Sequence, residues 1–193
     1  MANADEKVLL WLNGIAGEFS VLDGVIRWVV SDYLIPVSLA LGLILLWFSG
    51  SDRVSRQRHQ IGVFVALSSM ALSSLAVFTI NAVYFRPRPF LDHDVTLLFY
   101  QPTDSSFPAN PIAAAFGIAA GIWGVNRRAG TVSLLAAGIY ALARVLAGVH
   151  YPSDVIAGAL IAVVVTFLVF KLTDLLGPIP IWVIKGARIL CLA

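Results

Sequence analysis

Long apolar stretches constrain the fold of this chain more than any other feature of its sequence. A helix that spans a bilayer needs about 20 mostly apolar residues. Five stretches reach or approach that length: 33–49, 60–84, 110–126, 130–149 and 154–176. Composition agrees, because 59% of the residues are hydrophobic and 12% are charged, whereas soluble domains carry about 25% charged residues. The sequence therefore predicts an all-α, multi-pass membrane helical bundle.

Both ends of the chain are expected to lie outside the spanning core, which covers residues 33–176. Residues 1–31 are predicted to form one or two amphipathic helices, with Trp11 and Trp28 suited to the membrane interface. Alternatively, this segment holds a sixth span. A C-terminal interfacial helix is expected within 178–193. The 193 residues are thus predicted to form a single membrane domain with five or six transmembrane helices.

The basic residues gather on one side of the predicted bundle. Two spans separate the loop 50–59 from the loop 125–130, so both loops fall on the same side. That side holds eight of the thirteen Lys and Arg residues, namely Arg53, Arg56, Arg58, Arg127, Arg128, Lys171, Lys185 and Arg188. The positive-inside rule makes it cytoplasmic. The loop 85–109 and the turn 149–154 then face outward from the cell (plasma or inner) membrane.

Composition also limits the partners and cofactors of the chain. A net charge of +2 is too small to indicate nucleic acid. The single cysteine, Cys191, rules out an intramolecular disulfide. No metal-ligand set is visible. The expected partner is membrane lipid, and the oligomeric state is left open.

The two outward segments contain an unusual set of charged residues. The run FRPRPF holds Arg86 and Arg88, and the run ARVLAGVHYPSD holds Arg144, His150 and Asp154. These segments are far apart in the sequence, yet the charge count puts them on one face. We therefore expect them to form one cluster.

The chemistry of the cluster fits a phosphate ligand. An arginine near the membrane end of a helix, as Arg144 is, costs several kcal/mol unless it has an acidic partner, and a phosphate can be that partner. Guanidinium forks bind phosphate oxygens two at a time. Asp154 is predicted at a helix start, where a carboxylate is favoured, one turn after His150. It can orient the imidazole for attack on phosphorus, with a phosphohistidine then hydrolysed by water.

Each of these residues also has a purely structural interpretation. Arg144 can pair with Asp154, His150 can cap a helix beside Tyr151, and Arg86 can lie among lipid head groups. The convergence of two distant loops on one face favours a shared site.

The spacing of these residues resembles the motifs of the type 2 phosphatidic acid phosphatase (PAP2) superfamily, over about residues 8–176. The first family motif is lysine, six residues, then Arg-Pro. Here Arg88 and Pro89 match, and Asn81 stands at the lysine position. The third motif is Ser-Arg, five residues, His, three residues, Asp. Its Arg, His and Asp match, and Ala143 replaces the serine.

The resemblance is greatest to the bacterial undecaprenyl-diphosphatase branch, and it implies roles for the matched residues. His150 would be the nucleophile and Asp154 its orienting acid. Arg88 and Arg144 would bind phosphate, and Arg86 is added as a third candidate. The family mechanism requires no metal and no other cofactor.

The second family motif, Pro-Ser-x-His, departs from the family pattern in this chain. Pro108 matches, but Ala109 stands at the serine position and Pro111 at the position of the acid histidine. Proline has no side-chain proton to give. Asn110 can still donate a hydrogen bond to phosphate, and His93, in the same outer loop, is a candidate substitute acid.

The missing acid indicates which substrate the chain can use. A phosphomonoester expels an alkoxide, which needs a proton, whereas a diphosphate expels a phosphate whose second pKa is about 6. The sequence therefore predicts a lipid phosphatase that converts a polyprenyl (undecaprenyl) diphosphate to the monophosphate at the outer face. The alternative is a catalytically impaired relative that binds, senses or translocates a lipid phosphate.

Overall fold

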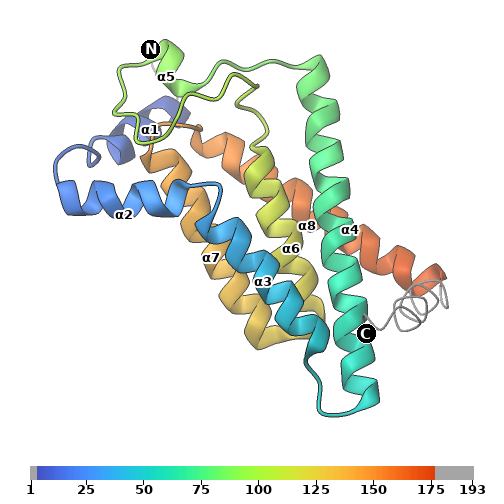
Figure 1. Cartoon of the computed structure of the whole chain (residues 1–193). Helices are drawn as coiled ribbons and strands as arrows, with labels where there is room; N and C mark the ends of the chain where they lie inside the picture. Colours follow the sequence, from blue (N-terminus) through green and yellow to red (C-terminus); the bar gives the residue numbers. More distant parts are fainter. Residues whose placement is uncertain (1–3, 177–193) are drawn as a thin grey trace.

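The structure, a computed structural model, describes residues 4–176, and within that range the chain is helical with no strand. Figure 1 shows the helices as a tilted bundle with loops and short helices gathered at one end. The elements in chain order are α1 (Ala4–Asn13), α2 (Ser20–Val30), α3 (Leu34–Phe48), α4 (Arg53–Val83), α5 (Pro89–Asp92), α6 (Asn110–Val125), α7 (Arg127–Leu146) and α8 (Pro152–Leu176). The all-α prediction is confirmed.

Each of the five predicted spans coincides with one helix, but the helices differ in their fitness to cross a membrane. By length and composition, α4, α7 and α8 qualify alone, and α2 with α3 qualifies as a pair bent by 47°. The apolar helix α6 has only 16 residues, about 24 Å at 1.5 Å per residue. Because α6 packs against α4, α7 and α8, its apolar faces are largely covered by protein. Within residues 4–176, three or four spans therefore meet the criterion, compared with the five or six predicted for the chain.

The N-terminal segment forms two short helices, of 10 and 11 residues. Neither is long enough to span a membrane by itself. In Figure 1, α2 lies across the long direction of the bundle. Trp11 and Trp28 are each 72% exposed, as expected for side chains that meet lipid. The predicted C-terminal helix falls outside the residues that the structure describes.

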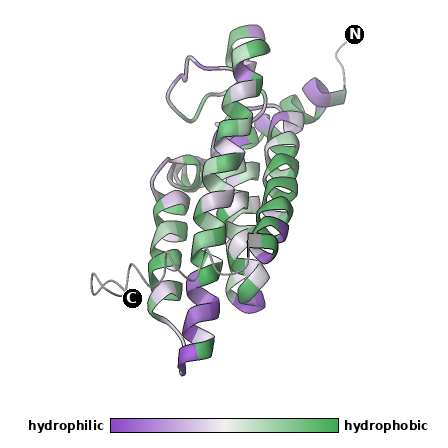
Figure 2. Cartoon of the chain, turned by 90° about the vertical axis from the view of Figure 1, so that its right-hand side faces the viewer, coloured by the Kyte–Doolittle hydropathy of each residue, from purple (hydrophilic) through white to green (hydrophobic). Residues whose placement is uncertain are grey.

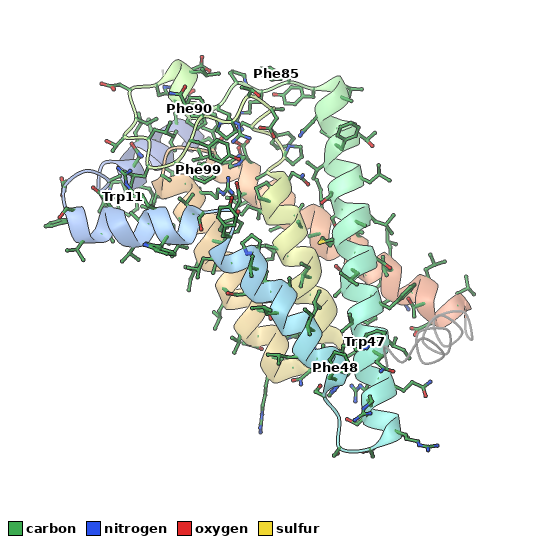
Figure 3. All side chains as sticks on the ribbon, viewed as in Figure 1. Trp11, Trp47, Phe48, Phe85, Phe90 and Phe99 are labelled. Carbon is green, nitrogen blue, oxygen red and sulfur yellow. The ribbon has the colours of Figure 1, made fainter. Side chains whose placement is uncertain are left out.

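The distribution of side chains divides the bundle into bands. Figure 2 shows a mainly hydrophobic middle, with hydrophilic residues at the start of α4 and in the loops at the opposite end. Among the aromatic side chains labelled in Figure 3, Trp47 and Phe48 lie near the lower end of α3, whereas Phe85, Phe90 and Phe99 lie near the loops. Aromatic residues at two levels are typical of a protein that crosses two membrane–water interfaces.

Small residues let α4 and α6 approach closely. A Cβ added at Gly121 would lie 2.5 Å from Ala66 Cα, so this contact requires glycine. Ser69 and Ser73 are fully buried on the same side of α4, and the Ser73 hydroxyl donates to the Ser69 carbonyl at 2.6 Å. Small and weakly polar residues are favoured where membrane helices touch.

Backbone hydrogen bonds join the segment between α4 and α6 to the end of α7 and the start of α8, at one end of the bundle. The Leu98 amide donates to the Ala147 carbonyl at 3.2 Å, and the Ala109 amide donates to the Asp154 carbonyl at 3.1 Å. The long segment between α4 and α6 therefore packs directly on the turn between α7 and α8. The residues of the predicted cluster share this end.

Candidate active site

A tight turn delivers His150 to the centre of the site. Helix α7 ends at Leu146, and Gly148 follows with φ +72°, a left-handed conformation that costs glycine little. Helix α8 then starts at Pro152, whose fixed φ suits the first turn of a helix. His150 lies between these two signals and is 1% exposed.

The hydrogen bonds of His150 fix its tautomer. Arg88 Nη1 lies 3.2 Å from Nε2 of the imidazole, and a guanidinium can only donate. Nε2 must therefore accept, which places the ring proton on Nδ1. Nδ1 lies 3.0 Å from the Ser106 carbonyl, to which it donates. His150 thus presents a lone pair on Nε2 toward Arg88.

Burial and charge keep this imidazole neutral. The pKa of His150 lies well below its ordinary value of 6.5, because burial disfavours the charged ring and because Arg88 and Arg144 add nearby positive charge. A neutral imidazole is the form that can act as a nucleophile.

Asp154 reaches His150 indirectly. Its Oδ2 atom lies 3.9 Å from His150 Nδ1, beyond hydrogen-bond distance. Instead, Oδ2 accepts from the Ser106 hydroxyl at 2.5 Å and from the Tyr151 amide at 2.9 Å. The expected direct contact is replaced by a bridge, in which Ser106 touches the ring with its carbonyl and the carboxylate with its hydroxyl.

Sequence reasoning did not single out Ser106, which is fully buried. The signal available in the sequence was its place in the run SSFP, immediately before the second-motif proline. The backbone that carries this motif therefore still contributes to the site, although the serine and histidine positions of the motif are Ala109 and Pro111.

Arg86, expected at a phosphate, is bonded to the protein itself. Its Nη1 donates to Asp154 Oδ1 at 2.6 Å, its Nη2 donates to Asp5 at 2.8 Å, and its guanidinium lies 3.9 Å from the ring centroid of Tyr151. Asp5 also accepts from the Ser153 amide at 2.9 Å. These contacts fasten α1 to the start of α8 and neutralise the buried Asp154 carboxylate.

Arg88 is the arginine beside the imidazole, and all three of its side-chain nitrogens donate hydrogen bonds to protein atoms. Besides His150, its Nη1 donates to the Val149 carbonyl at 3.3 Å. Its Nη2 pairs with Asp104 Oδ1 at 2.7 Å, with the Arg88 side chain 4% exposed and Asp104 63% exposed. Its Nε donates to the Asp104 carbonyl at 3.0 Å.

Arg144 has an internal acidic partner, although the sequence analysis expected a phosphate in that position. Its Nη2 pairs with Asp32 and also contacts the Tyr140 hydroxyl. Its guanidinium lies 4.5 Å from the ring centroid of Phe99. The sequence allowed Asp154 as a structural partner, but the structure gives Asp32, from the bend between α2 and α3. Nε of Arg144 is buried without a partner among the described residues.

The remaining candidate site residues are His93 and Asn110. The ring of His93 packs edge-to-face on Tyr151, with centroids 5.9 Å apart. Asn110 is exposed at the start of α6, where Pro111 occupies the first turn and loses no helical hydrogen bond. Asn110 lines a cavity of about 340 Å³ between α4 and α6, together with Asn81 and Asp104.

The fold and this end of the bundle define a helical membrane protein with a buried imidazole set against a guanidinium. Residues 62–177 match the PAP2 superfamily, more than half of the chain. The protein belongs to that superfamily.

Two relatives are similar to this chain over most of its length. The chain is 30% identical over 167 residues to the undecaprenyl-diphosphatase BcrC of Bacillus subtilis (strain 168), covering 86% of this chain and 83% of the relative. It is 28% identical over 161 residues to the bacitracin transport permease protein BcrC of Bacillus licheniformis, covering 83% and 76%.

Solved structures share the fold. The crystal structure of Aquifex aeolicus LpxE is similar with a TM-score of 0.63 and 25% identity, covering 86% of this chain and 93% of that chain. The crystal structure of the first transmembrane PAP2 type phosphatidylglycerolphosphate phosphatase, from Bacillus subtilis, gives a TM-score of 0.65 at 17% identity, covering 89% and 85%.

Proposed function

We propose that this protein is a lipid phosphate phosphatase that converts a polyprenyl diphosphate, such as undecaprenyl diphosphate, to the monophosphate at the outer face of the cell membrane. The observation that carries the proposal is the neutral, fully buried His150, whose Nε2 lone pair meets Arg88 at 3.2 Å. The similarity to an undecaprenyl-diphosphatase supports the substrate. The gathering of basic loops at the opposite end supports the outward orientation.

The reaction runs in two displacements. Arg88 Nη1 turns from Nε2 of His150 to the terminal phosphate, which frees the Nε2 lone pair. That lone pair forms a bond to the terminal phosphorus, and the bond from phosphorus to the bridging oxygen breaks, so that its electron pair leaves with the lipid monophosphate. Water then attacks the phosphohistidine, the P–N bond returns its pair to Nε2, and inorganic phosphate departs with the oxygen and both protons of the water. Arg88, and Arg144 if it leaves Asp32, would stabilise the charge that spreads over the transferred group.

The altered second motif favours a diphosphate substrate. General acid help is worth about 10²–10⁴-fold where a leaving group needs it, and Pro111 cannot give it. A leaving phosphate, with a second pKa of about 6, departs at neutral pH without that proton. His93 is the candidate substitute, and His93→Ala should then slow the release of phosphate; an unchanged rate would remove it from the mechanism.

The test measures phosphate release by the purified full-length protein from farnesyl diphosphate and from farnesyl monophosphate. We expect release from the diphosphate, less from the monophosphate, and a loss of about a thousandfold or more in His150→Ala. Turnover of the monophosphate at an equal rate would contradict the substrate assignment, and unchanged turnover in His150→Ala would contradict the nucleophile.

A second candidate function is supported by the internal ion pairs of Arg88 and Arg144 and by the altered second motif. In this version the protein binds, senses or translocates a lipid phosphate without hydrolysing it. Tight binding of farnesyl diphosphate with no phosphate release, from either the wild-type protein or His150→Ala, would select it.

A further inference from the structure

The pocket beside Arg88 that Asn110 lines has not yet been given a part in the reaction. It lies between α4 and α6, has a volume of about 340 Å³, and is lined by Phe78, Asn81, Ala82, Phe85, Asp104, Ser105 and Asn110. Phe78, Ala82 and Phe85 give it an apolar side, whereas the two asparagines, Ser105 and Asp104 give it a polar side. Phe78 is 71% and Phe85 63% exposed, so the apolar side continues onto the outer surface of α4, where lipid is expected.

Asp104 joins this pocket to the nucleophile. Asp104 lines the pocket, and its carboxylate pairs with Arg88 Nη2 at 2.7 Å. The other partners of Arg88 are two backbone carbonyls and Nε2 of His150. Of the four, the Asp104 carboxylate is the only anion, and it belongs to a side chain that is 63% exposed. A phosphate at Arg88 would therefore compete with this carboxylate for the guanidinium.

We propose that the pocket is the subsite for the leaving lipid phosphate, and that Asp104 is an internal anion that the substrate must displace from Arg88. The inference rests on the proposed function. It adds where the lipid lies in the same site and which residue opposes its binding. The terminal phosphate lies at Arg88 and His150, the lipid-linked phosphate lies against the neutral amides of Asn81 and Asn110, and the apolar tail follows Phe78 and Phe85.

The physical reason is charge. The pocket lining contains no cation, so the two amides can donate hydrogen bonds to a phosphate but cannot outweigh the negative charge of Asp104. While Asp104 pairs with Arg88, its carboxylate competes with phosphate for the guanidinium. Once displaced, the carboxylate repels the bound phosphates. The carboxylate is more than half exposed, so solvent weakens both effects.

The experiment measures binding of a methylene-bridged farnesyl diphosphonate, which cannot be hydrolysed, to the full-length protein in detergent by calorimetry. We expect Asp104→Asn to bind it about fivefold more tightly than the wild-type protein, because a neutral side chain competes less for Arg88. Asp94→Asn is the matched control, since it removes the same charge from the same outer loop, and its affinity should equal that of the wild-type protein. If Asp104→Asn does not fold, Asp104→Ser takes its place.

A second variant tests the pocket itself. Ala82→Trp fills the apolar side and should weaken binding of the farnesyl analogue about tenfold, while leaving binding of methylenediphosphonate without a lipid unchanged. Equal affinity in the wild-type protein and Asp104→Asn, tighter binding in Asp94→Asn as well, or an Ala82→Trp protein that binds the farnesyl analogue normally would each overturn the inference.

Failure here and failure of the proposed function give different results. If Asp104→Asn binds more tightly but neither protein releases phosphate from farnesyl diphosphate, the subsite stands and the hydrolytic function falls. If both proteins release phosphate and their affinities are equal, the function stands and the role of Asp104 falls.

Discussion

The two halves of the candidate site differ in how they are built. The nucleophile half contains His150, Asp154, Ser106 and Arg86, and its members are buried or half-buried and bonded to one another at 2.5–3.0 Å. The phosphate half contains Arg88, Arg144 and the second-motif segment. There the family lysine, serine and histidine positions are Asn81, Ala109 and Pro111, and the two arginines pair with Asp104 and Asp32.

The nucleophile and the residues that would bind phosphate are therefore held by separate sets of contacts. The nucleophile half is satisfied without a ligand, because its hydrogen bonds close within the protein. The phosphate half is neutralised by carboxylates that lie partly in solvent, 63% exposed for Asp104 and 44% for Asp32. A ligand can compete for such exposed pairs far more easily than for the pair of Arg86 with the fully buried Asp154.

Disruption of that buried pair should have the largest effect. Arg86→Gln leaves the Asp154 carboxylate buried without its cation, which should lower the free energy of unfolding by about 3 kcal/mol. Denaturant titration in detergent measures it. In the double variant with Asp154→Asn, the two losses should be less than additive; full additivity would mean that the ion pair does not couple these side chains.

Ser106→Ala tests the bridge between Asp154 and His150. Without the hydroxyl, Asp154 Oδ2 loses its 2.5 Å donor, and we expect kcat to fall about tenfold. The freed carboxylate lies near Nδ1, which should raise the pKa of His150, so the acid limb of the pH–rate profile should move to higher pH. Ser73→Ala, an equally buried serine within α4, is the control. A lower rate with an unmoved acid limb would show that Ser106 is needed only for packing.

The pH dependence follows from the lowered pKa of His150. The unfolded chain binds a proton to this residue near pH 6.5 and the folded protein binds it only at lower pH, so stability is unaffected above pH 6.5 and is lost as pH falls below it. His150→Asn keeps a donor for the Ser106 carbonyl but does not titrate, so its melting temperature should depend less on pH in that window. Parallel curves for the two proteins would place the imidazole in solvent.

The smallest expected effect concerns Asp32→Asn, which releases Arg144 from its carboxylate. If Arg144 can bind phosphate, affinity for the farnesyl diphosphonate should rise about two- to fivefold, the modest gain expected from a half-exposed pair. If Arg144 serves only to hold the bend between α2 and α3, affinity should stay constant while the melting temperature falls. Calorimetry and a thermal melt on the same sample separate the two outcomes.

Much of the fold follows from local sequence signals. The apolar runs placed α3, α6, α7 and α8 within three residues of their observed bounds, because a continuous apolar stretch of this length has few alternatives to a helix in a membrane. Helix α4 begins earlier than predicted, at Arg53, inside the segment 50–59 that was expected to be a loop. The start of α8 was also readable, since proline and an acidic residue together favour a helix N-terminus. The number of spans was not readable in this way, because α6 is short and its burial among α4, α7 and α8 depends on packing.

Several groups of the candidate site could be read from the sequence alone: the imidazole of His150, the carboxylate of Asp154, three arginines, and a second motif without its serine and histidine. Ser106 and Asp104 could not be read in this way. Which groups meet was settled by the folded structure. It joined Asp32 to Arg144, Asp104 to Arg88 and Ser106 to both His150 and Asp154. Spacing along one chain fixes contacts within a helix or a turn, whereas contacts between distant segments depend on how those segments pack, and no local pattern records that.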